Sequence, residues 1–255
     1  MKLIGGTLIC HNPIRYDYCI EAAIRSLVAV CDEVIVLDCQ SDDGTPALLR
    51  KLQVEFSHLY IFQNRWDVAP NFERLSRLTN IARDYLDSRW HLNLQADEVL
   101  HEESFSVIRQ AVQSEMGKSF SFTRLNFWGD QSRYFRASHK NPPCSPSVIR
   151  LALREIDSVR DAESLEAVNL CRTFERQLRI FHYGFIRDRR IHCDKIINMQ
   201  QWFGLGVDQR VVKQKREKGA FDPWEFFKRE DLERYTGSHP KFAQRWLRDH
   251  ALDWR

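Results

Sequence analysis

The chain has 255 residues, of which 43% are hydrophobic and 29% are charged. This composition is typical of a soluble globular protein and excludes a disordered or collagen-like chain. The 38 basic and 35 acidic residues nearly balance, so the net charge of +3 does not by itself predict nucleic-acid binding. Seven cysteines include no CxxC pair and leave one over, which argues against a disulfide or zinc framework. We therefore expect a reducing, cytoplasmic location.

The first ten residues hold one lysine and a short apolar run that ends at the polar segment His11-Asn12-Pro13. This run is shorter than the apolar core of a signal peptide. No stretch approaches the roughly 20 apolar residues of a membrane-spanning helix. We therefore expect neither a signal peptide nor a membrane-spanning helix. The length of the chain suits one domain with a C-terminal extension.

Short apolar runs alternate with amphipathic stretches over the first hundred residues, which is the pattern of βαβ units and a largely parallel sheet. Thr45-Pro46 supplies the N-cap and first-turn proline of one helix. Strands are expected at 3–10, 33–38, 59–64 and 90–94, and helices at 18–30, from 45 onward and at 71–86. The buried side of the last helix is expected to hold Phe72, Leu75, Leu78, Ala82 and Leu86.

After about residue 115 the chain is richer in aromatic residues and proline, and strands expected at 120–127, 148–153 and 178–183 no longer alternate with helices. Near the end, Asp222-Pro223-Trp224-Glu225 has the features of a capping box and predicts a helix to about Tyr235. The expected fold is an α/β, Rossmann-like, mixed and mostly parallel sheet flanked by helices, with a helical, aromatic-rich C-terminal extension. We place its boundaries at 1–190 (1–100 and 101–190) and 191–255.

Three loops are expected at the carboxyl ends of strands, where open α/β sheets bind ligands because loops converge there and helix N-termini offer free N–H groups. The first contains Cys10 and Asn12, which are candidate ligand contacts. The other two are the segments 38–45 and 95–98.

In their order and spacing, four blocks of this sequence resemble the family 2 glycosyltransferases of the GT-A fold, the nucleotide-diphospho-sugar transferase superfamily. The resemblance covers residues 3–100 well and the remainder weakly. The blocks are Thr7-Leu8-Ile9-Cys10-His11-Asn12, Asp32-Glu33-Val34-Ile35-Val36-Leu37-Asp38, Ser41-Asp42-Asp43-Gly44-Thr45 and Leu92-Asn93-Leu94-Gln95-Ala96-Asp97-Glu98.

The resemblance implies that Asp38 contacts the base or ribose of a nucleotide; the alternative is that it only caps the following turn. It also implies that Asp97 binds Mn²⁺ or Mg²⁺, which bridges the diphosphate and neutralises its charge as it leaves. The family segment usually reads Asp-x-Asp, whereas Gln95 stands in the first position here and can only hydrogen-bond. The alternative for Asp97 is a capping role at a helix N-terminus.

Three further residues resemble parts of such a site. His182 resembles the late histidine that completes the metal site, although a lone histidine on an apolar strand is often a hydrogen-bonded core residue. Arg187 and Arg77 resemble basic groups that bind the nucleotide or its diphosphate. Arg77 is also compatible with a solvated position on a helix face.

An inverting transfer needs a base for the acceptor hydroxyl, and a carboxylate is the usual choice. We select Asp161 over Glu163 and Glu166, although each is also compatible with an ordinary surface acid. Aromatic side chains can stack on an acceptor sugar. The aromatic candidates are Phe127, Trp128, Tyr134, Trp202 and Phe203.

The sequence thus favours an inverting, metal-dependent glycosyltransferase that uses a nucleotide-sugar donor. Its acceptor is expected to be a glycan, a lipid-linked molecule or a small molecule, with peripheral membrane contact possible and no nucleic acid. A nucleotidyltransferase of related fold is one alternative, but a glycine-rich basic loop is missing after the first strand. A non-catalytic sugar-nucleotide-binding protein is another, suggested by Gln95. A dehydrogenase would need a GxGxxG motif there.

Overall fold

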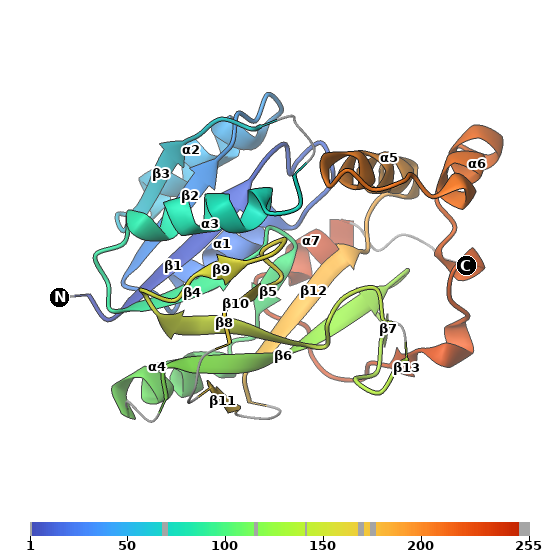
Figure 1. Ribbon diagram of the computed structural model, residues 1–255. Helices are drawn as coiled ribbons and strands as arrows, with labels where there is room; N and C mark the ends of the chain where they lie inside the picture. Colours follow the sequence, from blue (N-terminus) through green and yellow to red (C-terminus); the bar gives the residue numbers. More distant parts are fainter. Residues whose placement is uncertain are drawn as a thin grey trace.

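The computed structural model describes residues 2–67, 71–114, 117–140, 142–167, 171–173 and 177–249 (Figure 1). A mixed sheet of eleven strands runs through the described part of the chain, and helices flank it, which confirms the predicted α/β class. Its strands are β1 (Ile4–Cys10), β2 (Glu33–Asp38), β3 (Leu59–Gln63), β4 (Trp90–Leu94), β5 (Glu98–Leu100), β6 (Ser119–Trp128), β7 (Arg133–Tyr134), β8 (Ser147–Leu153), β11 (Cys171–Thr173), β12 (Arg179–Phe185) and β13 (Glu233–Arg234).

The first half of the sheet is parallel, with strand order β3-β2-β1-β4. Apolar side chains of β1 and β2 fill two cores, one on each face of this half. One core packs against α1 (Ile20–Val28), α2 (Thr45–Glu55) and α4 (Ser104–Ser114), and the other against α3 (Arg74–Asp84). The expected strands and helices of residues 3–86 are confirmed, with ends that differ by a few residues.

The prediction that Phe72 belongs to the buried face of α3 is wrong. Phe72 precedes the helix, which begins at Arg74, and 46% of its surface is exposed. Arg74 occupies the buried face instead, because it lies one turn before Leu78.

The second half of the sheet is mixed. β8 pairs antiparallel with both β4 and β6, and β12 lies parallel to β6 and antiparallel to β5. The register places His182 of β12 opposite Glu98 on one side and Asn126 on the other. A separate hairpin of β9 (Ser158–Val159) and β10 (Ser164–Leu165) lies next to β8 and α3. The halves expected at 1–100 and 101–190 therefore share one sheet, and their boundary stays a prediction.

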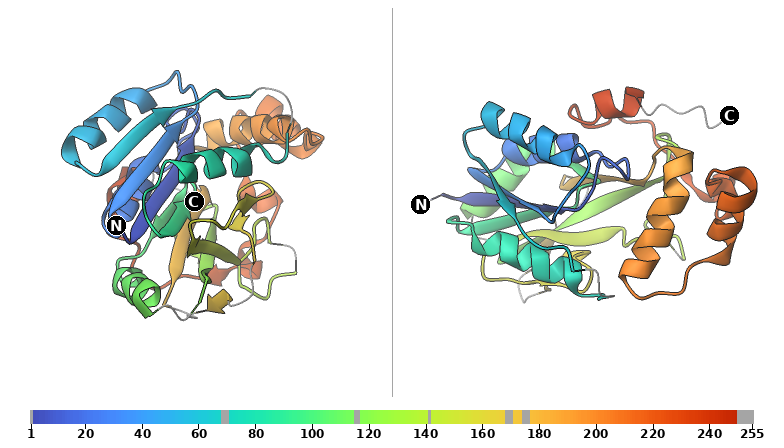
Figure 2. Two further views of the ribbon diagram at one scale, coloured as in Figure 1. Left: turned by 60° about the vertical axis from the view of Figure 1, so that its left-hand side comes forward. Right: turned by 90° about the horizontal axis from the view of Figure 1, so that it is seen from above.

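The C-terminal part carries α5 (Arg189–Trp202), α6 (Gln209–Lys218), the 3₁₀ turns η1 (Pro223–Glu225) and η2 (Arg229–Asp231), and α7 (Gln244–Asp249). Figures 1 and 2 show α5 lying beyond the carboxyl ends of the parallel strands. Residues 250–255 of the expected extension lie outside the described residues. Among the helices described, none combines the length and apolar character needed to cross a membrane.

The helix predicted from Asp222 to Tyr235 is wrong. Asp222 does cap a turn, because its side chain accepts a hydrogen bond from the Trp224 N–H. The Glu225 carboxylate, however, binds the side chains of Gln214 and Lys218 on α6 instead of closing a capping box. Only the 3₁₀ turn η1 forms, and the chain then continues into η2 and β13.

Candidate active site

A cavity of about 470 Å³ opens at the carboxyl ends of β1 and β4. Its walls come from the loops after these strands, the start of α3, the β9–β10 turn, the end of β12 and α5. Of the site residues predicted from the sequence, the cavity is lined by Cys10, Gln95, Asp97, Asp161 and His182. The predicted residues that do not line it are Asn12, Asp38, Arg77 and Arg187.

Asp97 and His182 face each other inside this cavity, with 3.6 Å between Asp97 Oδ2 and His182 Nε2. Asn126 holds the histidine ring, because its Oδ1 lies 2.9 Å from His182 Nδ1. The amide orientation of Asn126 is set by its Nδ2, which donates to the carbonyl oxygens of Cys144 and Ser145. Nδ1 of His182 is therefore the N–H donor to Asn126, and Nε2 is the ring nitrogen that faces the Asp97 carboxylate.

The Asp97 carboxylate lies among basic groups. Burial alone would raise its pKa, but His182, Lys195 and Arg187 hold the pKa well below its usual range. Arg187 is fully buried, and its Nη2 lies 3.8 Å from Asp97 Oδ2. The same guanidinium donates to the carbonyl oxygens of Tyr16 and Gly184, which fixes its position. Asp97 is thus ionised and available as an oxygen ligand.

Two protein atoms at this point suit a hard divalent cation. A Cβ at position 184 would lie 2.5 Å from His182 Nε2 and 2.8 Å from Asp97 Oδ2, so glycine leaves both atoms uncovered. No group of three or more His, Cys, Asp or Glu that could hold a metal occurs among the described residues. Mg²⁺ and Mn²⁺ commonly take one or two protein ligands and fill the remaining positions with phosphate and water oxygens. The donor set therefore fits a metal that a substrate helps to bind.

Asp38 and Asn12 organise the loops behind the cavity. Asp38 is fully buried; its Oδ1 accepts from the Ser41 N–H and its Oδ2 from the Gln63 amide, each at 3.1 Å. Asn12 adopts a left-handed backbone conformation (φ 51°), and its side-chain oxygen accepts from the Asp42 N–H. The contacts of Asp38 are thus those of the alternative interpretation, in which this residue caps the turn that follows β2. Of the predicted residues Cys10, Asn12 and Asp38, only Cys10 lines the cavity, and its thiol approaches Asp38 Oδ1 at 3.9 Å.

Arg74, which is not among the residues predicted from the sequence, lines the cavity, whereas the predicted Arg77 does not. Its guanidinium lies 4.8 Å from the centre of the Trp66 ring, whereas Arg77 is largely exposed and pairs with Asp67 at 3.6 Å. The signal was present in the sequence, because Arg74 lies one turn before Leu78 on the buried helix face, and Arg77 does not.

Aromatic rings form one wall of the cavity. His11 stacks on Trp66 with ring centres 4.5 Å apart, and Trp202 of α5 meets Trp66 edge-on at 5.3 Å. Trp202 and Phe203, proposed as stacking residues, line the cavity together with Trp128. The other two candidates, Phe127 and Tyr134, belong to a separate hydrophobic cluster.

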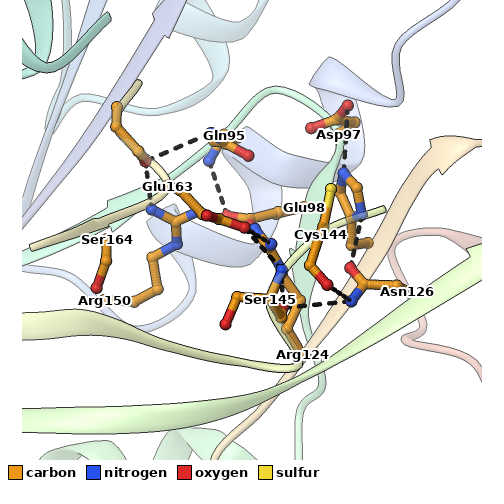
Figure 3. A network of polar contacts seen from close by, with 12 residues as sticks. Gln95, Asp97, Glu98, Arg124, Asn126, Cys144, Ser145, Arg150, Glu163 and Ser164 are labelled. Carbon is orange, nitrogen blue, oxygen red and sulfur yellow. Dashed lines mark hydrogen bonds and ion pairs between the residues drawn. The ribbon is translucent and has the colours of Figure 1, made fainter. Parts of the chain in front are cut away.

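A buried ion network lies beneath the site (Figure 3). Glu98 Oε1 accepts from Arg150 at 2.7 Å and from Arg124 at 3.2 Å, while Glu98 Oε2 accepts from the backbone N–H of Gln95. Burial would raise the pKa of Glu98, but the two guanidinium groups lower it. The network was not expected from the sequence, since its members come from three separate strands. It fixes the turn that carries Asp97.

The same network holds the turn that carries Asp161. Arg150 Nη1 donates to the carbonyl oxygen of Ala162 at 2.8 Å, and the Gln95 side chain approaches this oxygen at 3.4 Å. Glu163 is bound by Arg124 at 2.6 Å and by the Ser145 N–H at 2.7 Å. Asp161 lines the cavity and accepts a single backbone hydrogen bond, from the Glu163 N–H, among the described contacts. The third candidate base, Glu166, is exposed and does not line the cavity.

The structure of this chain is similar to crystal structures of S. aureus TarS. TarS 1–349 matches with a TM-score of 0.50 at 12% sequence identity, over 90% of this chain and 73% of that one. Its complex with UDP-GlcNAc matches with a TM-score of 0.50 at 11% identity, over 90% of this chain and 74% of that one. No family model and no curated protein sequence match the chain. At this identity the likeness shows a shared GT-A-like α/β fold.

Proposed function

We propose that the protein is a glycosyltransferase that moves a sugar from a nucleoside-diphosphate sugar to an acceptor hydroxyl. The observation that carries this proposal is the facing pair Asp97 and His182, oriented by Asn126, in a cavity at the carboxyl ends of parallel strands. The fold shared with TarS, which has been crystallised with UDP-GlcNAc, gives independent support. Residues 1–100 would hold the nucleotide and 101–190 the acceptor, while α5 of the extension expected at 191–255 would cover the site.

In this proposal Mn²⁺ or Mg²⁺ is held by Asp97 and His182. When bound, such an ion neutralises charge on the diphosphate. Arg187 keeps Asp97 ionised, while Cys10, Gln95 and Arg74 line the side of the cavity where the nucleotide would lie. The stacked rings of His11 and Trp66 offer a flat apolar surface to a base or sugar.

Asp161 is proposed as the base for the acceptor hydroxyl. Glu163 is bound by Arg124 and Ser145, so its oxygens are less available for proton transfer. The acceptor oxygen would attack the anomeric carbon from the face opposite the leaving diphosphate while Asp161 takes its proton, which inverts the anomeric configuration.

The test is a thermal-shift panel of UDP-, GDP-, CMP- and dTDP-sugars with and without Mn²⁺. A ligand at a hundredfold its dissociation constant stabilises a protein by about 2.7 kcal/mol, which a melting curve resolves. We expect one nucleotide class to raise the melting temperature in a Mn²⁺-dependent way. Asp97→Asn should abolish this shift, whereas Glu217→Gln, on the exposed part of α6, should keep it.

With the donor identified, transfer and slow donor hydrolysis are measured. Asp161→Asn should bind the donor normally and lose about 10²–10⁴-fold in transfer rate. Binding without any transfer or hydrolysis in the wild type would favour a sugar-nucleotide-binding protein. Release of sugar 1-phosphate, with the nucleotide retained on the product, would identify a nucleotidyltransferase. Retention of anomeric configuration would contradict the direct displacement.

A further inference from the structure

Lys195 is a buried lysine that the proposed mechanism does not yet use. It lies in α5, its residue surface is only 5% exposed, and it lines the same cavity as Asp97 and His182. Its ammonium nitrogen lies 5.5 Å from the centre of the Phe185 ring and 5.9 Å from that of Tyr18. Within the part of the chain that the structure describes, no side chain or carbonyl group hydrogen-bonds or ion-pairs with this ammonium group.

A buried ammonium group without such a partner is unfavourable for folding, because burial removes its hydration. The two aromatic rings offset part of this cost through cation–π contacts, but they supply no hydrogen-bond acceptor for the ammonium protons. Lysine on the neighbouring helix shows the ordinary arrangement: Lys215 of α6 is half exposed and pairs with Asp194. The position of Lys195 is therefore explained better by a ligand in the cavity than by packing.

The charged groups around Lys195 make this end of the cavity attractive to anions. Arg187, whose guanidinium lies 4.5 Å from the centre of the Tyr18 ring, adds a second positive charge, and Asp97 supplies one negative charge. The remaining titratable neighbours are the thiol of Cys144 and the buried ring of His192. Burial and Arg187 lower the pKa of Lys195 to about 8, which leaves the amine mostly protonated at neutral pH. Positive charge is thus in excess beside Asp97.

We propose that the ammonium group of Lys195 binds the diphosphate of the donor and stabilises the charge that develops when the nucleoside diphosphate leaves. This inference rests on the proposed glycosyltransferase function. In the transfer, the bond between the anomeric carbon and the diphosphate oxygen breaks, and its electron pair stays on that oxygen. The acceptor oxygen forms the new bond, and its proton goes to Asp161. Lys195 keeps its proton throughout and acts through its charge and hydrogen bonds.

The placement of α5 explains how this lysine reaches the leaving group. The Asp188 side chain caps the helix by accepting from the Arg190 N–H, and Asn198 donates to the Tyr16 hydroxyl. At the far end the Trp202 carbonyl accepts from the Asn71 N–H at the entrance to α3. These contacts fix α5 over the cavity, so that Lys195 is held in the cavity wall within electrostatic range of Asp97.

The experiment compares Lys195→Met and Lys195→Arg with the control Lys215→Met. Calorimetry measures the affinity for the nucleoside diphosphate of the donor, for the free nucleoside and for inorganic pyrophosphate. We expect Lys195→Met to weaken diphosphate and pyrophosphate binding by about tenfold to a hundredfold, as for loss of a charged hydrogen bond, and to leave nucleoside binding unchanged. Lys195→Arg should recover part of the affinity, and Lys215→Met should match the wild type.

In transfer assays Lys195→Met should lower kcat by about 10²–10³-fold, since the contact strengthens as charge develops. Its melting temperature should equal or exceed that of the wild type, because a buried charge is removed. Unchanged diphosphate affinity, an equal loss for nucleoside and diphosphate, or a lower melting temperature would overturn the assignment.

Two outcomes separate this inference from the proposed function. If the wild type binds pyrophosphate through Lys195 but transfers no sugar, the anion site stands and the transferase proposal fails. If sugar transfer is robust and Lys195→Met retains full kcat and affinity, the transferase proposal stands and the role of Lys195 is wrong. If the wild type binds neither pyrophosphate nor any nucleotide, both are wrong.

Discussion

The backbone of Gly184 passes beside the two atoms that would hold the metal. This close approach leaves no room for any side chain larger than that of glycine at position 184. Any Cβ would clash with both atoms, because it would lie 2.5 Å from His182 Nε2 and 2.8 Å from Asp97 Oδ2. Since His182 is fixed by Asn126 and Asp97 by Arg187, neither side chain can move away without losing a partner. The glycine is therefore required by access to the site and not by backbone conformation.

We accordingly predict that Gly184→Ala lowers the affinity for Mn²⁺ in the presence of nucleotide by about 10–100-fold, the range seen when the surroundings of a metal ligand are disturbed. The matched control is Gly206→Ala, because nothing lies within 4 Å of a Cβ at that position. Mn²⁺ titrations followed by calorimetry or electron paramagnetic resonance measure both. Equal Mn²⁺ affinities in the two variants would show that Asp97 and His182 do not form the metal site.

At the scale of elements, side chains from three strands join in one ion network around the Glu98 carboxylate. Glu98 begins β5, Arg124 lies in β6 and Arg150 in β8, and the network joins them beneath the two turns that carry Asp97 and Asp161. Breaking a buried ion pair is far more destabilising than breaking an exposed one, because a charge is left buried without its partner.

Arg150→Met should therefore destabilise the protein by about 3 kcal/mol or more, since it removes one partner of Glu98 and the donor to the Ala162 carbonyl. Arg25→Met, which breaks the surface pairs with Glu21 and Glu55, should change stability by less than about 1 kcal/mol. Urea unfolding monitored by circular dichroism compares the two. Similar losses in both variants would mean that water reaches the network and screens it.

Elements were predictable where local pattern and tertiary packing agreed. Strand β2, which ends in Asp38, and helix α2 form as expected, because their apolar periodicity matches the burial that the sheet imposes. The expected N-cap of α2 is wrong: Gly44 takes that position, Thr45 is the first helical residue, and its backbone N–H donates to the Asp43 side chain. The capping box at Asp222 failed because Glu225 found stronger partners, Gln214 and Lys218, on a helix that local sequence cannot place. A local sequence pattern does not determine the structure when a distant element offers a stronger competing contact.

At the scale of the whole molecule, the site depends on pairings that are distant in sequence. The β5–β12 and β6–β12 registers bring His182 beside Asp97 and Asn126, although Asn126 and His182 are 56 residues apart along the chain. A motif can indicate Asp97, and a resemblance can indicate His182, but the ring orientation set by Asn126 requires the folded sheet. For the same reason the sequence indicates only a loop and helix start around Lys195, since the burial of this side chain is created by the docking of α5 onto the cavity.

The sheet also contains a histidine whose protonation is coupled to folding of the whole molecule. His91 of β4 is fully buried, and its Nε2 lies 2.6 Å from the Thr7 hydroxyl, which in turn donates to Asn93. Burial, reinforced by Arg83 and Arg150, lowers the pKa of His91 to about 3. Because the unfolded chain binds the proton near pH 6.5 and the folded protein does not, stability is complete above pH 6.5 and falls between pH 6.5 and 3.

His91→Gln should keep a side-chain donor for Thr7 and remove this proton-linked loss. Between pH 7 and pH 5 the variant should lose about 2 kcal/mol less unfolding free energy than the wild type, as expected for a pKa of about 3 in the folded protein and 6.5 in the unfolded chain. Burial also lowers the pKa of His192. Both proteins therefore still lose some stability in acid, because this ring is present in each. Urea unfolding at the two pH values measures the difference. If wild type and variant lose equal stability, His91 takes up its proton in the folded state, and the core between β1 and β4 must then open to water well before the molecule unfolds.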